Sequence, residues 1–263
     1  MKKTALGDLN FAYTDEGNGD VLLLLHGFPL NQSMWKHQIA ALTQTHRVIA
    51  PDLRGHGQTE VTEGTVTMAE MAGDVRGLLD HLEVNTPVSV GGLSMGGYVA
   101  WEFWSQFPMR VAKLLLFDTR AVADTEIVAR AREMMAAQVV AVGASMASES
   151  MLPKLVSEAT KNQQAAVVKE LENMILATDP QAIAATQRGM AQRRDMTELL
   201  PSIDVPTLVV CGSEDVISPP EEMESFANLI PNAQFVQIEN AGHLAPLEQP
   251  ELVNKAVRSF LAN

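Results

Sequence analysis

One glycine-rich stretch constrains the fold of this chain more than any other. Residues 88–91 are apolar or small, as in a buried strand, and a run compatible with a helix follows Gly96. Between them Gly92, Ser94 and Gly96 form a G-x-S-x-G pattern, which is typical of a sharp strand–turn–helix unit with the serine at its apex. The same pattern also fits a glycine-rich strand–helix turn whose only role is to let the helix pack against the strand. The rest of the chain therefore has to decide whether Ser94 has a chemical role.

The order of the apolar segments predicts a parallel sheet covered by helices on both faces. Unbroken apolar runs are typical of strands buried on both sides, and apolar residues spaced by three or four indicate helices. The runs expected to form buried strands are 21–25, 47–50, 87–91, 111–117, 205–211 and 234–238. Helices are expected from residue 33, behind a Thr67–Glu70 capping box, from the Ser94 turn to about residue 107, around 221–227 and from Pro250. Residues 8–14 alternate between apolar and polar, which predicts an edge strand with one solvated face.

A long segment interrupts this alternation. The 263 residues suit one large domain or a domain with an insertion. The segment from Asp118 to Val205 is far longer than the roughly 30 residues of a complete βαβ unit. It reads as helical, with Asp124 as an N-cap, Gly143 as a stop, and Asp179 ending one helix before Pro180 starts another. We expect residues 120–200 to form a helical cap, and residues 1–119 and 201–263 to form the core.

Charge and cysteine content limit the partners of the chain. A net charge of −13 argues against nucleic acid and against an anionic membrane surface, because both require clustered positive charge. The single cysteine, Cys211, excludes an internal disulfide and lies in an apolar run, where a buried and inert thiol is expected. The first residues lack the apolar core of a signal peptide. We therefore expect a cytoplasmic protein with a small-molecule partner.

Two residues that follow predicted strands could act together with Ser94, which would be the nucleophile. A serine hydroxyl needs a base within hydrogen-bond reach, and the base needs an orienting carboxylate. In an open parallel sheet, ligand sites gather at the carboxyl ends of the strands. His243 follows the last predicted strand and Asp215 follows the one before it. Ser94, Asp215 and His243 thus appear in the chain order of one known serine triad.

Other residues compete for these roles. Asp118 and Asp52 also close buried strands, but Asp215 is favoured because it lies nearer the strand that precedes His243. Glu214 is adjacent to Asp215 and is expected to point the other way. The remaining histidines are expected at turns, at helix ends or on the surface. Backbone N–H groups of Met95 and Phe28 are the candidate donors to an oxyanion.

Five motifs in this order resemble those of the α/β-hydrolase superfamily, and more closely those of its small esterase and enol-lactonase-like members. The motifs are His26-Gly27-Phe28-Pro29, residues 52–59, Gly92 to Gly97, Gly212 to Asp215, and Gly242-His243. The resemblance implies an α/β-hydrolase fold, with a mostly parallel sheet of about eight strands, helices on both faces and an inserted helical cap. It also implies a Ser–His–Asp triad that uses no metal and no organic cofactor.

The function expected from these residues is hydrolysis of small carboxylic esters or lactones through an acyl-enzyme intermediate. Ser94 disfavours the dehalogenase and epoxide hydrolase branches, which carry aspartate at that position. Carbon–carbon bond hydrolases usually have a Gly-Pro-Gly-like oxyanion loop, from which Phe28-Pro29-Leu30 departs. The alternatives are a carbon–carbon bond hydrolase or a cofactor-free perhydrolase that uses the same triad, and a non-catalytic small-molecule receptor. If the substrate is anionic, Arg120, Arg130 and Arg188 are candidate ligands, although solvated surface positions are the favoured expectation for each. The sequence makes no prediction of the oligomeric state.

Overall fold

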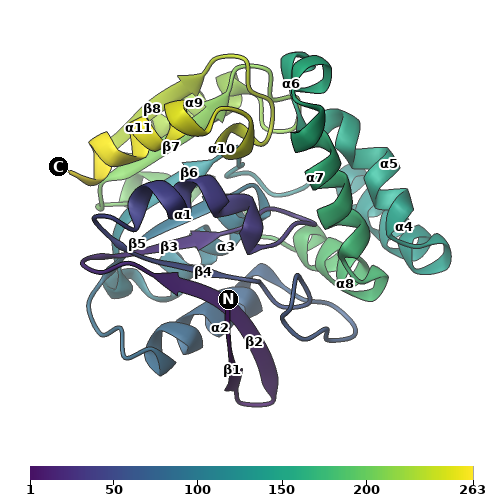
Figure 1. Cartoon of the computed structure of the whole chain (residues 1–263), viewed down its shortest axis with the longest axis horizontal. Coiled ribbons are helices and arrows are strands. Elements are labelled where there is room, and N and C mark those ends of the chain that lie inside the picture. The colour runs from purple at the N-terminus through teal and green to yellow at the C-terminus, as the bar shows by residue number, and fades with distance from the viewer. Residues whose placement is uncertain (263) are drawn as a thin grey trace.

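The computed structural model describes residues 1–262, and its centre is one eight-stranded sheet (Figure 1). The strands occur in the order β1-β2-β4-β3-β5-β6-β7-β8. The pairs β1–β2 and β2–β4 are antiparallel, and all other neighbours are parallel. The predicted fold class, a mostly parallel sheet with helices on both faces, is confirmed. The strands are β1 (Lys2–Leu6), β2 (Leu9–Glu16), β3 (Val21–Leu25), β4 (Arg47–Pro51), β5 (Val88–Leu93), β6 (Val111–Phe117), β7 (Thr207–Gly212) and β8 (Ala233–Ile238).

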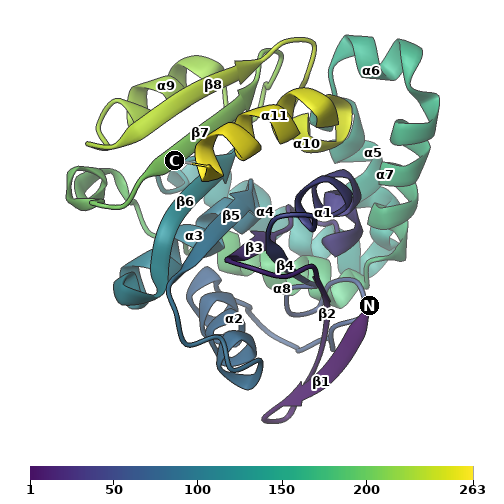
Figure 2. The same cartoon turned by 60° about the vertical axis from the view of Figure 1, so that its left-hand side comes forward.

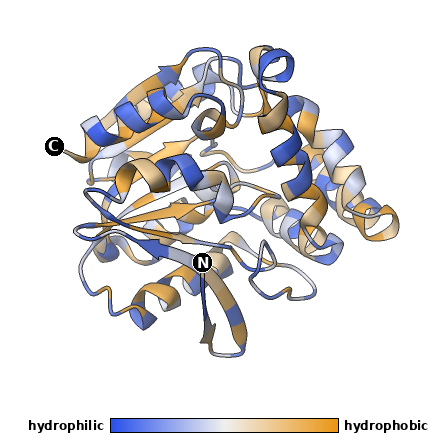
Figure 3. Cartoon of the chain, viewed as in Figure 1, coloured by the Kyte–Doolittle hydropathy of each residue, from blue (hydrophilic) through white to orange (hydrophobic). Residues whose placement is uncertain are grey.

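Helices cover the two faces of the sheet because parallel neighbours require crossover connections. On one face α1 packs against α11, and on the other α2 packs against α3 (Figure 2). The strands at the centre are mostly apolar, whereas many of the helices around them carry both apolar and polar residues (Figure 3). The helices outside the central segment are η1 (Gln32–Trp35), α1 (Lys36–Leu42), α2 (Met68–His81), α3 (Met95–Gln106), η2 (Pro108–Arg110), α9 (Pro220–Ala227), α10 (Ala245–Glu248) and α11 (Pro250–Leu261).

The amino-terminal part of the sheet differs from its prediction. Residues 8–14 were expected to form a half-solvated edge strand, but β1 takes the edge and β2 lies inside it. Four consecutive residues of β2, Phe11 to Thr14, are buried. One reason is that the loop after β4 covers this strand, where the Ala12 N–H donates to Thr59 Oγ1 at 2.9 Å. The helix expected from residue 33 is instead a 3₁₀ turn, capped by the Asn31 side chain, followed by α1.

The segment predicted to be helical contains five α-helices, and no strand lies among its residues. These helices form the right-hand side of the molecule in Figure 1. Gly143 and Asp179 end and start helices as predicted. The prediction of Asp124 as the N-cap of this segment's first helix was wrong. Thr125 caps α4, and Asp124 instead forms ion pairs with Arg132 and Arg193. The helices are α4 (Glu126–Val142), α5 (Ala144–Leu155), α6 (Glu158–Gln163), α7 (Ala165–Ala177) and α8 (Pro180–Ala191), followed by η3 (Thr197–Ser202).

These five helices, called the cap helices below, lie against loops at the carboxyl end of the sheet. The Thr178 hydroxyl donates to the Pro29 carbonyl after β3, and the Val66 N–H, in the loop between β4 and α2, donates to the Ala185 carbonyl. The Glu158 N–H donates to Glu214, which follows β7. The division into a core and a cap at residues 119–120 and 200–201 stays a prediction. The last residue of the predicted core, 263, lies outside the described part of the chain. None of the helices within residues 1–262 has the length and apolarity needed for a bilayer crossing.

Candidate active site

Ser94 occupies the turn between β5 and α3 in a backbone conformation that few non-glycine residues adopt. Its φ is 52° and its ψ is −112°, a region that is sterically costly for a residue with a Cβ. Surrounding contacts hold it there. The Ser94 N–H donates to the Phe117 carbonyl at 2.9 Å, and the Ser94 carbonyl accepts from the Thr119 hydroxyl at 2.8 Å. The turn therefore presents the serine side chain away from the sheet, as the G-x-S-x-G pattern predicts.

Close packing explains the glycine that follows the serine. A Cβ placed on Gly96 would lie 2.2 Å from the Leu25 carbonyl oxygen, at the end of β3. Only glycine allows the first turn of α3 to approach the neighbouring strand so closely. The Ser94 turn is thus fixed against both of the strands next to β5.

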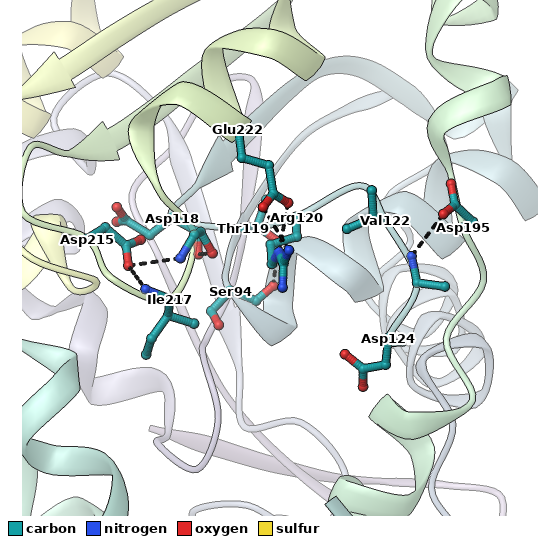
Figure 4. Close-up of polar contacts among 12 residues, drawn as sticks. Ser94, Asp118, Thr119, Arg120, Val122, Asp124, Asp195, Asp215, Ile217 and Glu222 are labelled. Carbon is teal, nitrogen blue, oxygen red and sulfur yellow. Dashed lines mark hydrogen bonds and ion pairs between the residues drawn. The ribbon is translucent and has the colours of Figure 1, made fainter. Parts of the chain in front are cut away.

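The structure brings together the three residues predicted to form a triad. His243 Nε2 lies 2.8 Å from Ser94 Oγ, and His243 Nδ1 lies 2.8 Å from Asp215 Oδ2. The other oxygen of Asp215 accepts from the N–H groups of Ile217, at 2.8 Å, and Ser218, at 3.0 Å (Figure 4). His243 and Asp215 are both buried. The carboxylate can therefore fix the imidazole with its Nδ1 proton toward Asp215, which leaves Nε2 free to accept the serine proton.

Asp118, the rival carboxyl group, lies beside Asp215 (Figure 4), but within residues 1–262 the hydrogen bond to the imidazole comes from Asp215 and not from Asp118. Its Oδ1 accepts from the Gly212 N–H at 2.8 Å, and Oδ2 has no hydrogen-bond partner within residues 1–262. Complete burial, together with the nearby charge of Asp215, raises the pKa of Asp118 well above its ordinary value. Asp118 therefore contacts the backbone of the neighbouring strand, whereas Asp215 contacts His243.

Asp118, Asp215 and Cys211 bring potential metal ligands within 4.8 Å of one another. A metal ion would need these groups deprotonated. Burial raises the pKa of the Cys211 thiol as well as that of Asp118, and both oxygens of Asp215 already accept hydrogen bonds. The cluster is better suited to holding protons than to binding a cation, and Cys211 is the buried thiol that its apolar run predicts.

The two predicted oxyanion donors are free to bind a ligand. In the part of the chain that the structure describes, neither the Phe28 nor the Met95 N–H has an acceptor. Met95 is the first residue of α3, where unpaired N–H groups favour negative charge. Gly27, the residue before Phe28, lies next to the nucleophile, since a Cβ on Gly27 would be 3.7 Å from Ser94 Cβ. Two unpaired donors thus accompany the Ser94 hydroxyl.

The other candidate residues have structural contacts. Asp52 accepts from the N–H groups of Gln32 and Gln58, which ties two loops together. His26 is the turn residue that was expected, because its Nε2 accepts from the Leu53 N–H and its Nδ1 donates to the Gly27 carbonyl. Glu214 contacts the cap helices and not His243.

The three arginines suggested for an anionic substrate each bind a carboxylate of the protein. Arg120 forms two hydrogen bonds of 2.7 Å with Glu222 (Figure 4), Arg130 pairs with Glu126 and Arg188 pairs with Glu133. A substrate carboxylate would have to compete with these partners.

Two residues that the sequence did not indicate support the site. Thr119 donates its hydroxyl to the carbonyl of Ser94, and Glu248 accepts hydrogen bonds from both neighbours of His243. The signal for Thr119 was its position two residues after the buried strand that ends at Phe117. Glu248 had a weaker signal, as the one acidic residue between His243 and Pro250.

A family model, solved structures and a sequence relative all place this chain in the same family. A family model described as alpha/beta hydrolase fold matches residues 20–250. The solved structure of a thermophilic esterase from Thermogutta terrifontis, with malate bound, is 46% identical with a TM-score of 0.96, and the match covers 97% of this chain and 93% of that one. An enol-lactonase from Burkholderia xenovorans LB400 is 26% identical with a TM-score of 0.92 over the whole of both chains. The 3-oxoadipate enol-lactonase 1 of Acinetobacter baylyi is 30% identical over 89% of this chain and 85% of its own length.

Proposed function

This chain belongs to the α/β-hydrolase family, and we propose that it is a serine hydrolase that cleaves small carboxylic esters or lactones through an acyl-enzyme. The observation that carries the proposal is the continuous chain of two 2.8 Å contacts from Ser94 through His243 to Asp215. The esterase and enol-lactonase among its relatives support the same class of reaction.

In the proposed reaction the Ser94 Oγ attacks the acyl carbon while its proton moves to His243 Nε2. Asp215 accepts the Nδ1–H hydrogen bond throughout and stabilises the imidazolium that forms. The negative charge on the former carbonyl oxygen is bound by the N–H groups of Phe28 and Met95. The tetrahedral intermediate collapses when His243 gives its proton to the leaving alcohol oxygen. Water, activated by the same imidazole, then releases the acid and restores the Ser94 hydroxyl.

The surroundings favour an uncharged acyl group. Arg120 has both carboxylate oxygens of Glu222 as partners, and breaking a bidentate pair of this kind is costly. Phe28 and Met95 contribute apolar side chains beside their N–H groups. A neutral ester or lactone would not have to displace a protein carboxylate.

Replacing Ser94 by alanine tests the proposal. We expect Ser94→Ala to lower kcat on a p-nitrophenyl ester by at least about 10³-fold, because the nucleophile acts as a unit with its base. A fluorophosphonate probe should add its mass to the wild type and not to the variant. The matched control, Ser202→Ala, replaces an exposed serine in η3 and should keep full activity.

Thermal unfolding and circular dichroism check that Ser94→Ala is folded. Retained ester turnover in that variant would refute the proposal. Activity on vinylogous diketones or with peroxide and a carboxylic acid, in the absence of ester hydrolysis, would favour the carbon–carbon hydrolase or the perhydrolase instead. Product release that stops after one equivalent per site would identify a receptor.

A further inference from the structure

We propose that Glu248 is a positioning residue that makes the alignment of His243 depend on the placement of the cap helices. This inference rests on the proposed function of Ser94 and His243. Glu248 ends the short helix α10 and is 2% exposed. A buried carboxylate persists only where several donors compensate its lost hydration. The identity of those donors indicates its role.

Glu248 binds the backbone on both sides of His243. Its Oε1 accepts from the Gly242 N–H at 2.8 Å and from the Leu244 N–H at 3.2 Å. These two N–H groups belong to the residues that flank the imidazole-bearing Cα. Hydrogen bonds to a charged acceptor are shorter and stronger than neutral ones. Glu248 therefore restrains the backbone from which His243 reaches Ser94 and Asp215.

The second oxygen of Glu248 binds the cap helices. Its Oε2 accepts from the Ser157 N–H at 2.7 Å, immediately before α6. The Ser157 hydroxyl donates to the Asn240 carbonyl at 3.2 Å, and the Gln164 side chain donates to the Glu248 carbonyl at 3.3 Å. The Glu248 carboxylate thus joins the cap helices to the loop that carries His243, and two further hydrogen bonds link the same segments.

Gly242 shows how closely the two segments approach. A Cβ on this residue would lie 2.7 Å from the Ser157 nitrogen and 2.8 Å from the Val156 carbonyl carbon. Both are backbone atoms that cannot move aside cheaply. The histidine loop and the Val156–Ser157 segment therefore pack as one unit.

Displacement of the cap helices would take one donor from Glu248 and leave a buried negative charge less well compensated. The carboxylate would then move toward other donors or water, and the Gly242 and Leu244 N–H groups would lose their fixed acceptor. Because a displacement of about 1 Å at a catalytic group can cost about 10²-fold in rate, cap placement becomes a condition for reactivity at Ser94.

Two replacements of Glu248 separate its functions. Glu248→Gln retains one acceptor oxygen and places an NH2 group against one set of donors, whereas Glu248→Ala removes both acceptors. We expect kcat on an activated ester to fall by about 10–100-fold in Glu248→Ala, and by less in Glu248→Gln. KM should change less than kcat, and the pH profile of kcat should shift. A purely structural role would lower the midpoint of thermal unfolding and leave kcat per folded site and the pH profile unchanged.

A matched pair at Ser157 isolates the cap contact. The φ of Ser157 is −62°, and Val156 before it is extended, so the backbone suits proline. Ser157→Pro removes the N–H that binds Glu248, whereas Ser157→Ala keeps it and removes only the hydroxyl. We expect Ser157→Pro to lower kcat at least threefold more than Ser157→Ala does. This excess should vanish when Glu248 is already alanine.

A spectroscopic readout keeps the test separate from the proposed function. The Nδ1 proton that joins His243 to Asp215 should give a downfield NMR resonance in the wild type. It should broaden or disappear in Glu248→Ala and Ser157→Pro, and persist in Ser157→Ala. This outcome would support the positioning role even if the wild type hydrolysed no ester. An unchanged resonance and an unchanged kcat in folded Glu248→Ala would overturn it.

Discussion

At the scale of single residues, two buried carboxyl groups close neighbouring strands at the same edge of the sheet. Asp215 has three donors, namely two backbone N–H groups and His243. Asp118 has the Gly212 N–H on one oxygen and an unpartnered second oxygen within residues 1–262. Three donors stabilise a charged carboxylate, and burial next to another negative charge favours the neutral form. The two carboxyl groups therefore differ in their hydrogen-bond partners, and burial beside Asp215 raises the pKa of Asp118 above its ordinary value.

Asparagine at each position tests this assignment. We expect Asp215→Asn to lower kcat by about 10³–10⁴-fold, because the amide would favour the wrong imidazole tautomer. Asp118→Asn should lower kcat by less than about tenfold, since an amide resembles a protonated carboxyl group and keeps the acceptor for Gly212. Steady-state kinetics on an activated ester measures both. A larger loss in Asp118→Asn would identify Asp118 as the orienting acid.

At the scale of elements, the close contact between α3 and the segment after β6 holds the nucleophile. A Cβ on Gly97 would lie 2.3 Å from Thr119 Oγ1 and 2.6 Å from Thr119 Cβ. Thr119 is the residue whose hydroxyl donates to the Ser94 carbonyl. The helix and the nucleophile therefore share one support. Gly73, in the middle of α2, has no atom within 4 Å of the corresponding position.

Replacing glycine by alanine should have opposite effects on stability in these two helices. We expect Gly97→Ala to destabilise the protein by about 1–3 kcal/mol through overpacking and to lower kcat, because Thr119 has to move. Gly73→Ala should stabilise it by about 0.5–1 kcal/mol and leave kcat unchanged, since alanine is the better helix former. Urea unfolding and ester kinetics compare the two variants. Equal effects would show that α3 can shift away from Thr119 at little cost.

At the scale of the whole molecule, buried histidines link stability to pH. Burial lowers the pKa of His26 from 6.5 to about 4 and that of His56 to about 3. The Nδ1 of His56 contacts the Arg54 carbonyl, and its Nε2 has no partner in the described chain. Unfolding exposes both rings to water, where they bind protons below pH 6.5. Between pH 6.5 and 4 the unfolded state thus binds more protons than the folded state.

The free energy of unfolding should therefore fall as the pH is lowered through this window, by about 1.4 kcal/mol per pH unit for each fully titrating histidine. The contribution is fully present above pH 6.5. We expect His56→Asn, whose amide can donate to the Arg54 carbonyl, to show a shallower fall than the wild type between pH 6.5 and 4. Urea unfolding at several pH values measures the difference. Asp118 has the opposite sign, because its raised pKa favours the folded state at low pH, and its effect cancels in this comparison. Parallel curves would contradict the prediction.

Most of the sheet could be predicted from the sequence because a strand buried on both faces must be apolar throughout. β3 and β6 begin and end with their apolar runs, at Val21–Leu25 and Val111–Phe117. The Thr67–Glu70 capping box also forms as its local spacing predicts. β1 escaped prediction because its five residues are exposed or half-buried, so only pairing with β2 makes it a strand.

Sequence order was also enough to select Ser94, Asp215 and His243, because the carboxyl ends of parallel strands necessarily meet at one edge of the sheet. Side-chain partners were decided only by the tertiary structure. Arg120 meets Glu222, and Glu248 meets Ser157, which lies 91 positions away along the chain. Such pairs carry no local spacing, since they depend on how segments pack after the sheet has formed. Periodicity therefore determines most of the buried elements, whereas packing decides which side chains touch and whether an exposed strand such as β1 forms.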